Sequence, residues 1–188
     1  SVDLRPDNGR DSIVGGSGDD TIYGMDDDDT LLGGLDNDVI YGGIDDDLII
    51  GESGNDRLFG DDGNDTVSGG LGNDTITGGA GADELSGGAD RDDFIVGSPT
   101  QGAGDTVYGG DGGDDYDRLI LTGAAPYRLR DVVEDSDGNG IDGTVEFLDA
   151  DGNVTGSLTF TNIEEIVPCF TPGTLIATPK GEVPVEHL

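Results

Sequence analysis

The amino-acid sequence predicts an all-β solenoid, in which short strands stack in successive coils. An aspartate recurs every nine residues, ten times without a gap. An apolar residue follows each of these aspartates by two positions, and a glycine precedes all but the first by five. A fixed period that carries a fixed carboxylate and a fixed apolar position is typical of a solenoid with a cation site in its turns.

Ten nonapeptides fill residues 6–95, and the carboxylate occupies the sixth position of each. These aspartates are Asp11, Asp20, Asp29, Asp38, Asp47, Asp56, Asp65, Asp74, Asp83 and Asp92. The eighth positions are Ile13, Ile22, Leu31, Ile40, Ile49, Leu58, Val67, Ile76, Leu85 and Phe94.

The purest repeat, residues 69–77, divides into a turn and a strand. Its first six residues, Gly-Gly-Leu-Gly-Asn-Asp, are mostly turn formers, because Gly, Asn and Asp adopt positive φ at little cost. Its last three, Thr75–Thr77, favour a very short strand. Because strand side chains alternate between faces, we expect the eighth position to point inward and the seventh and ninth outward.

The composition excludes several classes of partner. The 188 residues include 42 acidic and 8 basic side chains, a formal charge of -34, so nucleic acid and anionic membranes are repelled. With 32% hydrophobic residues, the chain needs its carboxylates neutralised before it folds. One cysteine forbids an internal disulfide, and no apolar run is long enough to span a membrane.

The nonapeptides resemble the glycine- and aspartate-rich repeats of the repeats-in-toxin (RTX) family. That resemblance implies a right-handed parallel β-roll with two nonapeptides per coil. It also implies calcium between neighbouring coils, held by sixth-position aspartates and by loop carbonyls, here those of Gly18, Gly54, Gly63, Gly72 and Gly81. One ladder would run from Asp11 to Asp83 and the other from Asp20 to Asp92, with room for roughly eight ions.

Electrostatics favours the same cation. Stacked coils lie ~4.8 Å apart, where two bare carboxylates repel by roughly 3 kcal/mol at an effective dielectric near 20. Calcium accepts flexible sites of oxygen ligands, magnesium demands stricter geometry, and zinc prefers His or Cys. The alternative is that the aspartates only form Asx turns.

Some repeats depart from the pattern at their second and fourth positions. Asp replaces Gly at the fourth position in four repeats, and Asp7, Met25, Glu52 and Asp61 occupy second positions. Those loops either bind calcium more weakly or gain affinity from the added charge. The sequence leaves both open.

The outward ninth positions form apolar stripes in the N-terminal half of the roll. One stripe contains Tyr23, Tyr41 and Phe59, and the other Val14, Leu32 and Ile50. They either stiffen the sheets by cross-strand packing or dock an upstream domain or a partner.

Residues 96–168 lose the strict period, and we expect a degenerate repeat and a cap of β-hairpins there. Asp105 and Asp114, nine residues apart, are candidates to close the roll. Hairpins are expected between 127–134 and 143–148, and between 145–149 and 154–160. A segment from Asp135, with Glu146 at its twelfth position, matches the EF-hand loop formally, but strands flank it; it is a solvated turn or a calcium loop without that fold.

Residues 169–188 resemble the first block of hedgehog/intein (Hint) autoprocessing domains, through Cys169, Gly173–Ile176, Thr178, Gly181, Val185–Glu186 and Leu188. A Cys169 thiolate would attack the carbonyl of Pro168 to form a thioester. The Thr-x-x-His block and terminal His-Asn of that family are missing, and His187 does not match the catalytic histidine. An alternative is a lone cysteine packed as a small hydrophobe.

We therefore expect a calcium-binding module of a secreted bacterial protein, folded by Ca²⁺ and not itself an enzyme. The family resemblance implies type I secretion, and we expect both ends of the sequence to be cuts through a longer protein. A self-cleaving precursor that uses Cys169 is one alternative, and an adhesin or surface-layer spacer is another. Motifs of RTX proteases and lipases are missing from the sequence.

Overall fold

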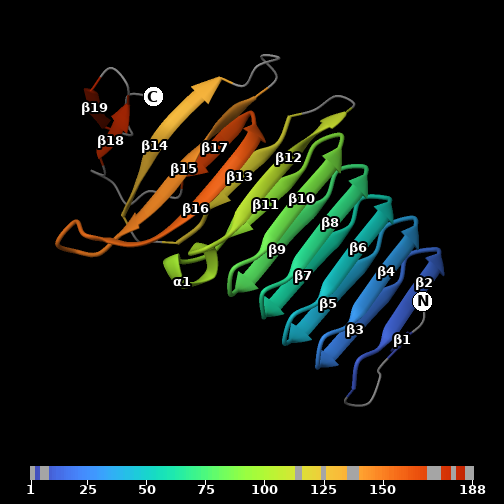
Figure 1. The fold of residues 1–188 in the computed structure, drawn as a ribbon. Helices are drawn as coiled ribbons and strands as arrows, with labels where there is room; N and C mark the ends of the chain where they lie inside the picture. Colours follow the sequence, from blue (N-terminus) through green and yellow to red (C-terminus); the bar gives the residue numbers. More distant parts are fainter. Residues whose placement is uncertain are drawn as a thin grey trace.

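The computed structural model describes residues 3–4, 9–112, 116–123, 126–134, 140–168, 175–178 and 181–184. Its main body is a parallel β-solenoid of two facing sheets (Figure 1). Odd-numbered strands form one sheet, in the order β1-β3-β5-β7-β9-β11-β13-β17. The other sheet has the order β14-β15-β16-β12-β10-β8-β6-β4-β2. Because consecutive strands alternate between sheets, two nonapeptides make one coil.

The roll consists of short strands of nearly uniform length. They are β1 (Asp3–Leu4), β2 (Ser12–Ser17), β3 (Thr21–Asp26), β4 (Thr30–Leu35), β5 (Val39–Ile44), β6 (Leu48–Ser53), β7 (Arg57–Asp62), β8 (Thr66–Leu71), β9 (Thr75–Ala80), β10 (Glu84–Ala89) and β11 (Asp93–Val96).

The strands are longer than the sequence predicts, because six residues rather than three belong to each of β2–β10. Each strand continues through the first three positions of the following nonapeptide. The glycine at the second position adopts positive φ, 116° at Gly70 for example, yet still pairs with the neighbouring coil. The two glycines therefore bend the strand without ending it, and the turn shrinks to positions four to six.

The eighth-position side chains form the predicted inward column. Each is buried, from Ile13 to Phe94, and most are fully enclosed. Val107 and Leu119 extend the column, because β12 (Thr106–Gly112) and β13 (Arg118–Leu121) stack on β10 and β11. Coil geometry thus continues past residue 95, where the strict nonapeptide period stops.

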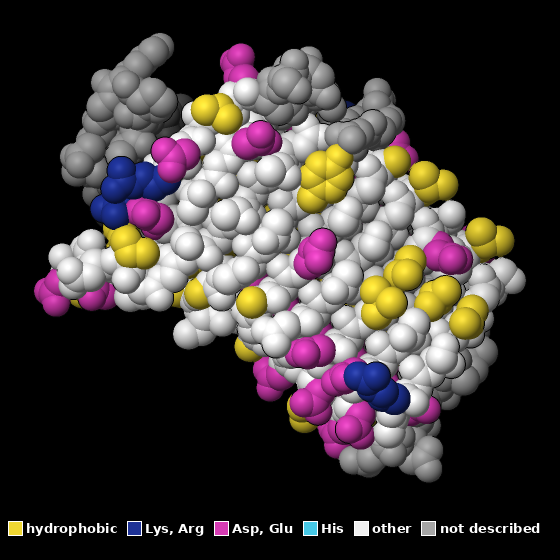
Figure 2. Space-filling model, viewed as in Figure 1, with side chains coloured by type: hydrophobic (Ala, Val, Ile, Leu, Met, Phe, Trp, Pro, Cys, Tyr) yellow, Lys and Arg dark blue, Asp and Glu magenta, His cyan; other side chains and the backbone are white. Residues whose placement is uncertain are grey.

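The ninth-position stripes lie on the outer faces, as predicted. Tyr23 stacks on Tyr41 with ring centroids 5.1 Å apart, and Tyr41 stacks on Phe59 at 4.8 Å. On the other sheet, Val14, Leu32 and Ile50 pair in register. Figure 2 shows hydrophobic side chains gathered over the N-terminal coils and acidic ones along the edge below them.

The expected hairpins form the cap. Strand β14 (Tyr127–Glu134) pairs antiparallel with β15 (Ile141–Leu148), and β15 pairs with β16 (Val154–Ile163). Strand β16 then stacks parallel on β12, and β17 (Glu165–Pro168) on β13. Val145, Phe147, Leu158 and Phe160 are buried, so the cap closes the apolar column at this end.

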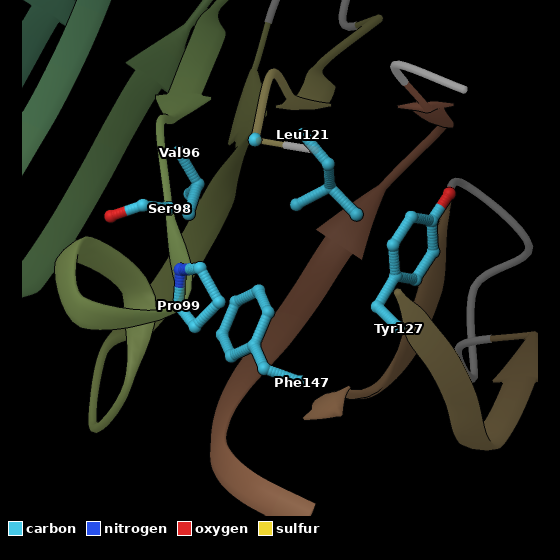
Figure 3. Close-up of a pocket in the computed structure, with 7 residues that line it drawn as sticks. Val96, Ser98, Pro99, Leu121, Tyr127 and Phe147 are labelled. Atoms are coloured by element: carbon cyan, nitrogen blue, oxygen red, sulfur yellow. The ribbon is translucent and has the colours of Figure 1, made fainter. Parts of the chain in front are cut away.

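A small apolar cavity of about 10 Å³ lies where the cap meets the roll, beside the short helix α1 (Pro99–Gly102). Figure 3 shows Phe147 and Leu121 facing one another across it. It is lined by Val96, Ser98, Pro99, Leu121, Gly123, Tyr127 and Phe147. It is too small to hold an organic ligand.

Beyond the cap, β18 (Leu175–Thr178) pairs antiparallel with β19 (Gly181–Pro184). In the part of the chain that the structure describes, no helix has the length and apolar character needed to cross a bilayer.

Candidate calcium site

The sixth-position aspartates stack into two ladders along opposite edges of the roll. In one, the backbone N–H of Asp29 donates to Oδ1 of Asp47, and that of Asp47 to Oδ1 of Asp65, both at 2.8 Å. In the other, Asp38 donates to Asp56 and Asp56 to Asp74 at the same distance. The carboxylates of Asp47, Asp56, Asp65 and Asp74 therefore each accept a hydrogen bond from the aspartate 18 residues earlier. The same bond links Asp11, Asp20, Asp65 and Asp74 to Asp29, Asp38, Asp83 and Asp92.

The second oxygen of these carboxylates has a different environment. Oδ2 is buried and has no hydrogen-bond partner in Asp11, Asp29, Asp38, Asp47, Asp56, Asp65, Asp74 and Asp83. A buried acceptor without a partner costs roughly 1–3 kcal/mol, and more when it is charged. A row of them along each edge matches what a hard cation requires.

The first-position glycines leave the space that these oxygens occupy. A Cβ on Gly60 would collide with Oδ2 of Asp65 and with the carbonyl oxygen of Gly78 in the next coil. The same collision is met at Gly51 with Asp56 and Gly69, and recurs along both edges. Two oxygens, one charged and one from the backbone, thus converge beside each such glycine. The glycine is required here for space, since its φ is ordinary.

Burial sets the protonation of the ladder in the absence of a cation. Loss of solvent raises the pKa of Asp47 and Asp56 to about 6, and that of Asp65 and Asp74 to about 7. Repulsion from neighbouring ladder aspartates also raises the pKa of Asp47 and Asp65, while the backbone hydrogen bond that each accepts lowers it. Each such carboxylate therefore favours either a proton or a bound cation.

Carboxylates alone do not complete a site. Among the described residues, no group of three or more His, Cys, Asp or Glu side chains is placed to hold one metal ion. Backbone carbonyls must therefore supply the remaining ligands. Calcium tolerates such mixed oxygen sets, whereas the roll offers zinc no His or Cys.

The ladders run further than the nonapeptides. The N–H of Asp83 donates to Oδ1 of Asp105 at 3.1 Å, and the N–H of Asp92 donates to Oδ1 of Asp117 at 2.8 Å. Burial raises the pKa of Asp105 to about 7, and its Oδ2 has no hydrogen-bond partner. Asp114, predicted together with Asp105 to close the roll, lies outside the described residues. Asp117 occupies the ladder position that follows Asp92, and its spacing to Leu119 repeats the aspartate-x-apolar signal.

A second pair of ladders, at the fifth positions, was missed by sequence reasoning. Oδ1 of Asn37 accepts the N–H of Asn55 at 2.8 Å, and Oδ1 of Asn55 accepts that of Asn73 at 2.7 Å. On the other edge, Asp46 accepts from Asn64. The signal was the Asn or Asp that precedes most sixth-position aspartates.

The irregular fourth and second positions tolerate non-glycine residues at positive φ. Asp27, Asp36, Asp45 and Asp90 adopt φ of 75–79° at the fourth position. Met25, Glu52 and Asp61 adopt 74–91° at the second. The expected carbonyl ligands at fourth positions face the next coil, because a Cβ on Gly72 or Gly81 would collide with the carbonyl oxygen of Gly54 or Gly63. The N–H of Gly18 donates to Oδ2 of Asp36 at 3.1 Å.

The remaining sequence predictions concern the EF-hand-like segment and Cys169. Glu146, twelfth in the EF-hand-like segment, pairs with Arg128 and, at 3.2 Å, with Arg130, so its carboxylate is already neutralised. Residues 135–139 of that segment, Cys169 and His187 lie outside the described residues.

Comparison with known proteins agrees with the repeat geometry. The profile of the RTX calcium-binding nonapeptide repeat (4 copies) matches residues 7–40, 33–67, 41–76 and 59–94. No curated protein sequence matches the chain. The solution structure of the AlgE6R3 subunit of the Azotobacter vinelandii mannuronan C5-epimerase is similar, with 26% identity over 67% of this chain and 70% of that one, but its TM-score of 0.23 adds nothing to the fold described above. Together these matches cover residues 7–94, the stretch that contains the sixth-position aspartates of both ladders and resembles RTX calcium-binding nonapeptide repeats.

Proposed function

We propose that calcium binding along both carboxylate ladders folds this module, so that calcium concentration switches it from an open polyanion to a rigid β-roll. The observation that carries the proposal is the row of buried, unpartnered Oδ2 atoms, of which Asp65 and Asp74 are examples. A chain that positions charged oxygens this way needs positive charge between its coils.

The energetics are consistent with a switch. Each pair of bare neighbouring rungs repels by roughly 3 kcal/mol at an effective dielectric near 20. A site with free calcium at 100 times its dissociation constant instead contributes roughly 2.7 kcal/mol. Summed over coupled sites, this difference exceeds the whole stability of an ordinary domain, roughly 5–15 kcal/mol.

The proposed ligands are the sixth-position aspartates together with neighbouring backbone carbonyls. Asp105 and Asp117 give each ladder six carboxylates and therefore five gaps. About ten ions, rather than eight, would fill a roll of this length. No step of catalysis is assigned to the module.

The cellular setting that we propose follows from the same switch. RTX repeats are typical of secreted bacterial proteins, and a chain that stays open at low cytosolic calcium would fold after export, with type I secretion as the proposed route. Linkage to a Hint domain through Cys169 stays a prediction from the sequence. Intact mass of a longer chain incubated with thiol tests it, since the absence of cleavage before Cys169 would contradict self-processing.

The direct test of the proposed function is a calcium titration of the 188-residue chain monitored by far-ultraviolet circular dichroism. We expect β-structure to appear cooperatively with calcium, and magnesium at equal concentration to be far less effective. Isothermal titration calorimetry on the same sample counts the ions. An unchanged spectrum from EDTA to saturating calcium would overturn the proposal.

A further inference from the structure

One ladder passes beyond the last aspartate into the cap. Oδ1 of Asp117 accepts the N–H of Asp92, the same bond that links successive aspartates along the ladder. The N–H of Asp117 then donates to Oε2 of Glu164, 47 residues later. Glu164 therefore occupies the position that an aspartate fills in every earlier coil.

The backbone around Glu164 repeats the pattern of the coils below. In the roll, the N–H of Arg118 donates to the carbonyl oxygen of Asp92 at 2.8 Å. In the cap, the N–H groups of Glu164 and Glu165 both donate to the carbonyl oxygen of Asp117 at 3.1 Å. Strands β13 and β17 pair in the matching register, Arg118 opposite Glu165.

The space beside a first-position glycine, where a carboxylate oxygen and a backbone carbonyl oxygen converge, is also reproduced in the cap. A Cβ on Gly87 would collide with Oδ2 of Asp92 and the carbonyl oxygen of Gly109. One coil further, a Cβ on Gly109 would collide with the carbonyl oxygen of Asn162 and come within 2.5 Å of Oδ2 of Asp117. Asn162, at a left-handed φ of 55°, thus presents its carbonyl where the roll uses a first-position glycine.

The nonapeptide turn is absent at this point. Two positions separate Asn162 from Glu164, against five from Gly87 to Asp92. Glu164, whose side chain is one methylene longer than that of aspartate, takes this position, and the nonapeptide period does not predict it. The opposite ladder lacks such an extension, because Thr159 stacks above Thr106 and so places Leu158 above Asp105.

We propose that Asn162 and Glu164 form a final calcium site with Asp117, outside the nonapeptide repeats, and that calcium there clamps the cap onto the roll. The carbonyl oxygen of Asn162 and the carboxylates of Asp117 and Glu164 are its oxygen donors, with backbone carbonyls completing the set. This inference rests on the proposed function of the ladders. It adds that docking of the cap depends on calcium.

The test uses Glu164→Gln, which removes the charge but keeps a side-chain oxygen to accept the N–H of Asp117. Glu165→Gln, an exposed neighbour, is the matched control. Gly109→Ala is a second variant that places a methyl group against the carbonyl of Asn162 without changing any charge. Amide hydrogen exchange of β15 and β16 is followed during calcium titration, alongside exchange of β5 and β7, and calorimetry counts the ions.

We expect Glu164→Gln to bind one ion fewer and to raise the calcium midpoint of cap protection roughly tenfold, since ligand charge sets calcium affinity. Protection of β5 and β7 and all behaviour of Glu165→Gln should match the wild type. Gly109→Ala should share the defect of the cap. Unchanged stoichiometry and cap midpoint in Glu164→Gln would overturn this inference while leaving the proposed function intact. A wild-type chain that binds no calcium would overturn the proposed function itself.

Discussion

Asp65 accepts the backbone N–H of Asp47 through Oδ1 at 2.8 Å, while its Oδ2 is buried without a hydrogen-bond partner. The two oxygens of one carboxylate therefore have different tasks. Oδ1 fixes the register of successive coils. Oδ2 is held beside a backbone carbonyl of the next coil, where only a proton or a cation satisfies it.

Replacement of Asp65 by Asn separates these tasks, because the amide oxygen still accepts the N–H of Asp47 but carries no charge. We expect the calcium midpoint to rise, and the free energy of unfolding in saturating calcium to fall by roughly 1–3 kcal/mol. Urea unfolding measures the second effect. Asp62→Asn, at an exposed position, is the control, and equal behaviour of the two variants would count against a ligand role for Asp65.

Gly60→Ala tests whether calcium binding needs the space beside the first-position glycine. The φ of Gly60 lies outside the left-handed region, so the substitution costs little in the backbone, yet the new methyl group meets Oδ2 of Asp65 and the carbonyl of Gly78. We expect a shallower, weaker calcium titration by circular dichroism. Gly16→Ala has open space but a φ of 105°, so it adds backbone strain alone. If Gly16→Ala lost more calcium affinity than Gly60→Ala, the space beside Gly60 would not be what calcium binding requires.

The pH dependence of the metal-free chain follows from the raised pKa values. Asp65, Asp74 and Asp105 have pKa values raised to about 7, above the value of 3.8 expected when unfolded. A raised folded pKa contributes stability that is fully present below 3.8 and is lost as the pH rises through about 7. In EDTA, β-structure should therefore increase as the pH falls from about 8 towards about 5.

In calcium the effect of acid should reverse, because protons compete for the same oxygens. The calcium midpoint should rise below about pH 7. Circular dichroism at several pH values, with and without EDTA, measures both trends. A steady loss of β-structure on acidification in EDTA would show that the ladder carboxylates are not buried as described.

Much of the roll was predictable from the sequence because each coil repeats one local rule. The nine-residue period fixes the eighth position inward and the sixth at the turn, and Ile40 and Asp38 lie where the period places them. The lengths of the strands were not predictable, since Gly-Gly pairs read as turn formers although the ladder bonds carry the strand through them. Asp117 and Glu164 were missed because insertions and a shortened turn break the period, and only three-dimensional stacking restores their register.

The stacked rings of Tyr23, Tyr41 and Phe59 provide a test of whether this outer stripe stiffens the sheet or docks a partner. Each half-buried ring lies on its neighbour, and such pairs contribute about 0.5–1.5 kcal/mol beyond their buried area. Replacing all three by Thr should lower stability in calcium without changing the elution volume on a sizing column. A change in self-association at equal stability would instead favour a docking surface.

The most direct test of the central claim is the far-ultraviolet circular dichroism of the chain in excess EDTA at neutral pH, repeated after addition of calcium. The account predicts an open chain in EDTA, because stacked bare carboxylates repel one another, and a cooperative gain of β-structure with calcium. Full β-structure in EDTA, unaltered by calcium, would contradict it.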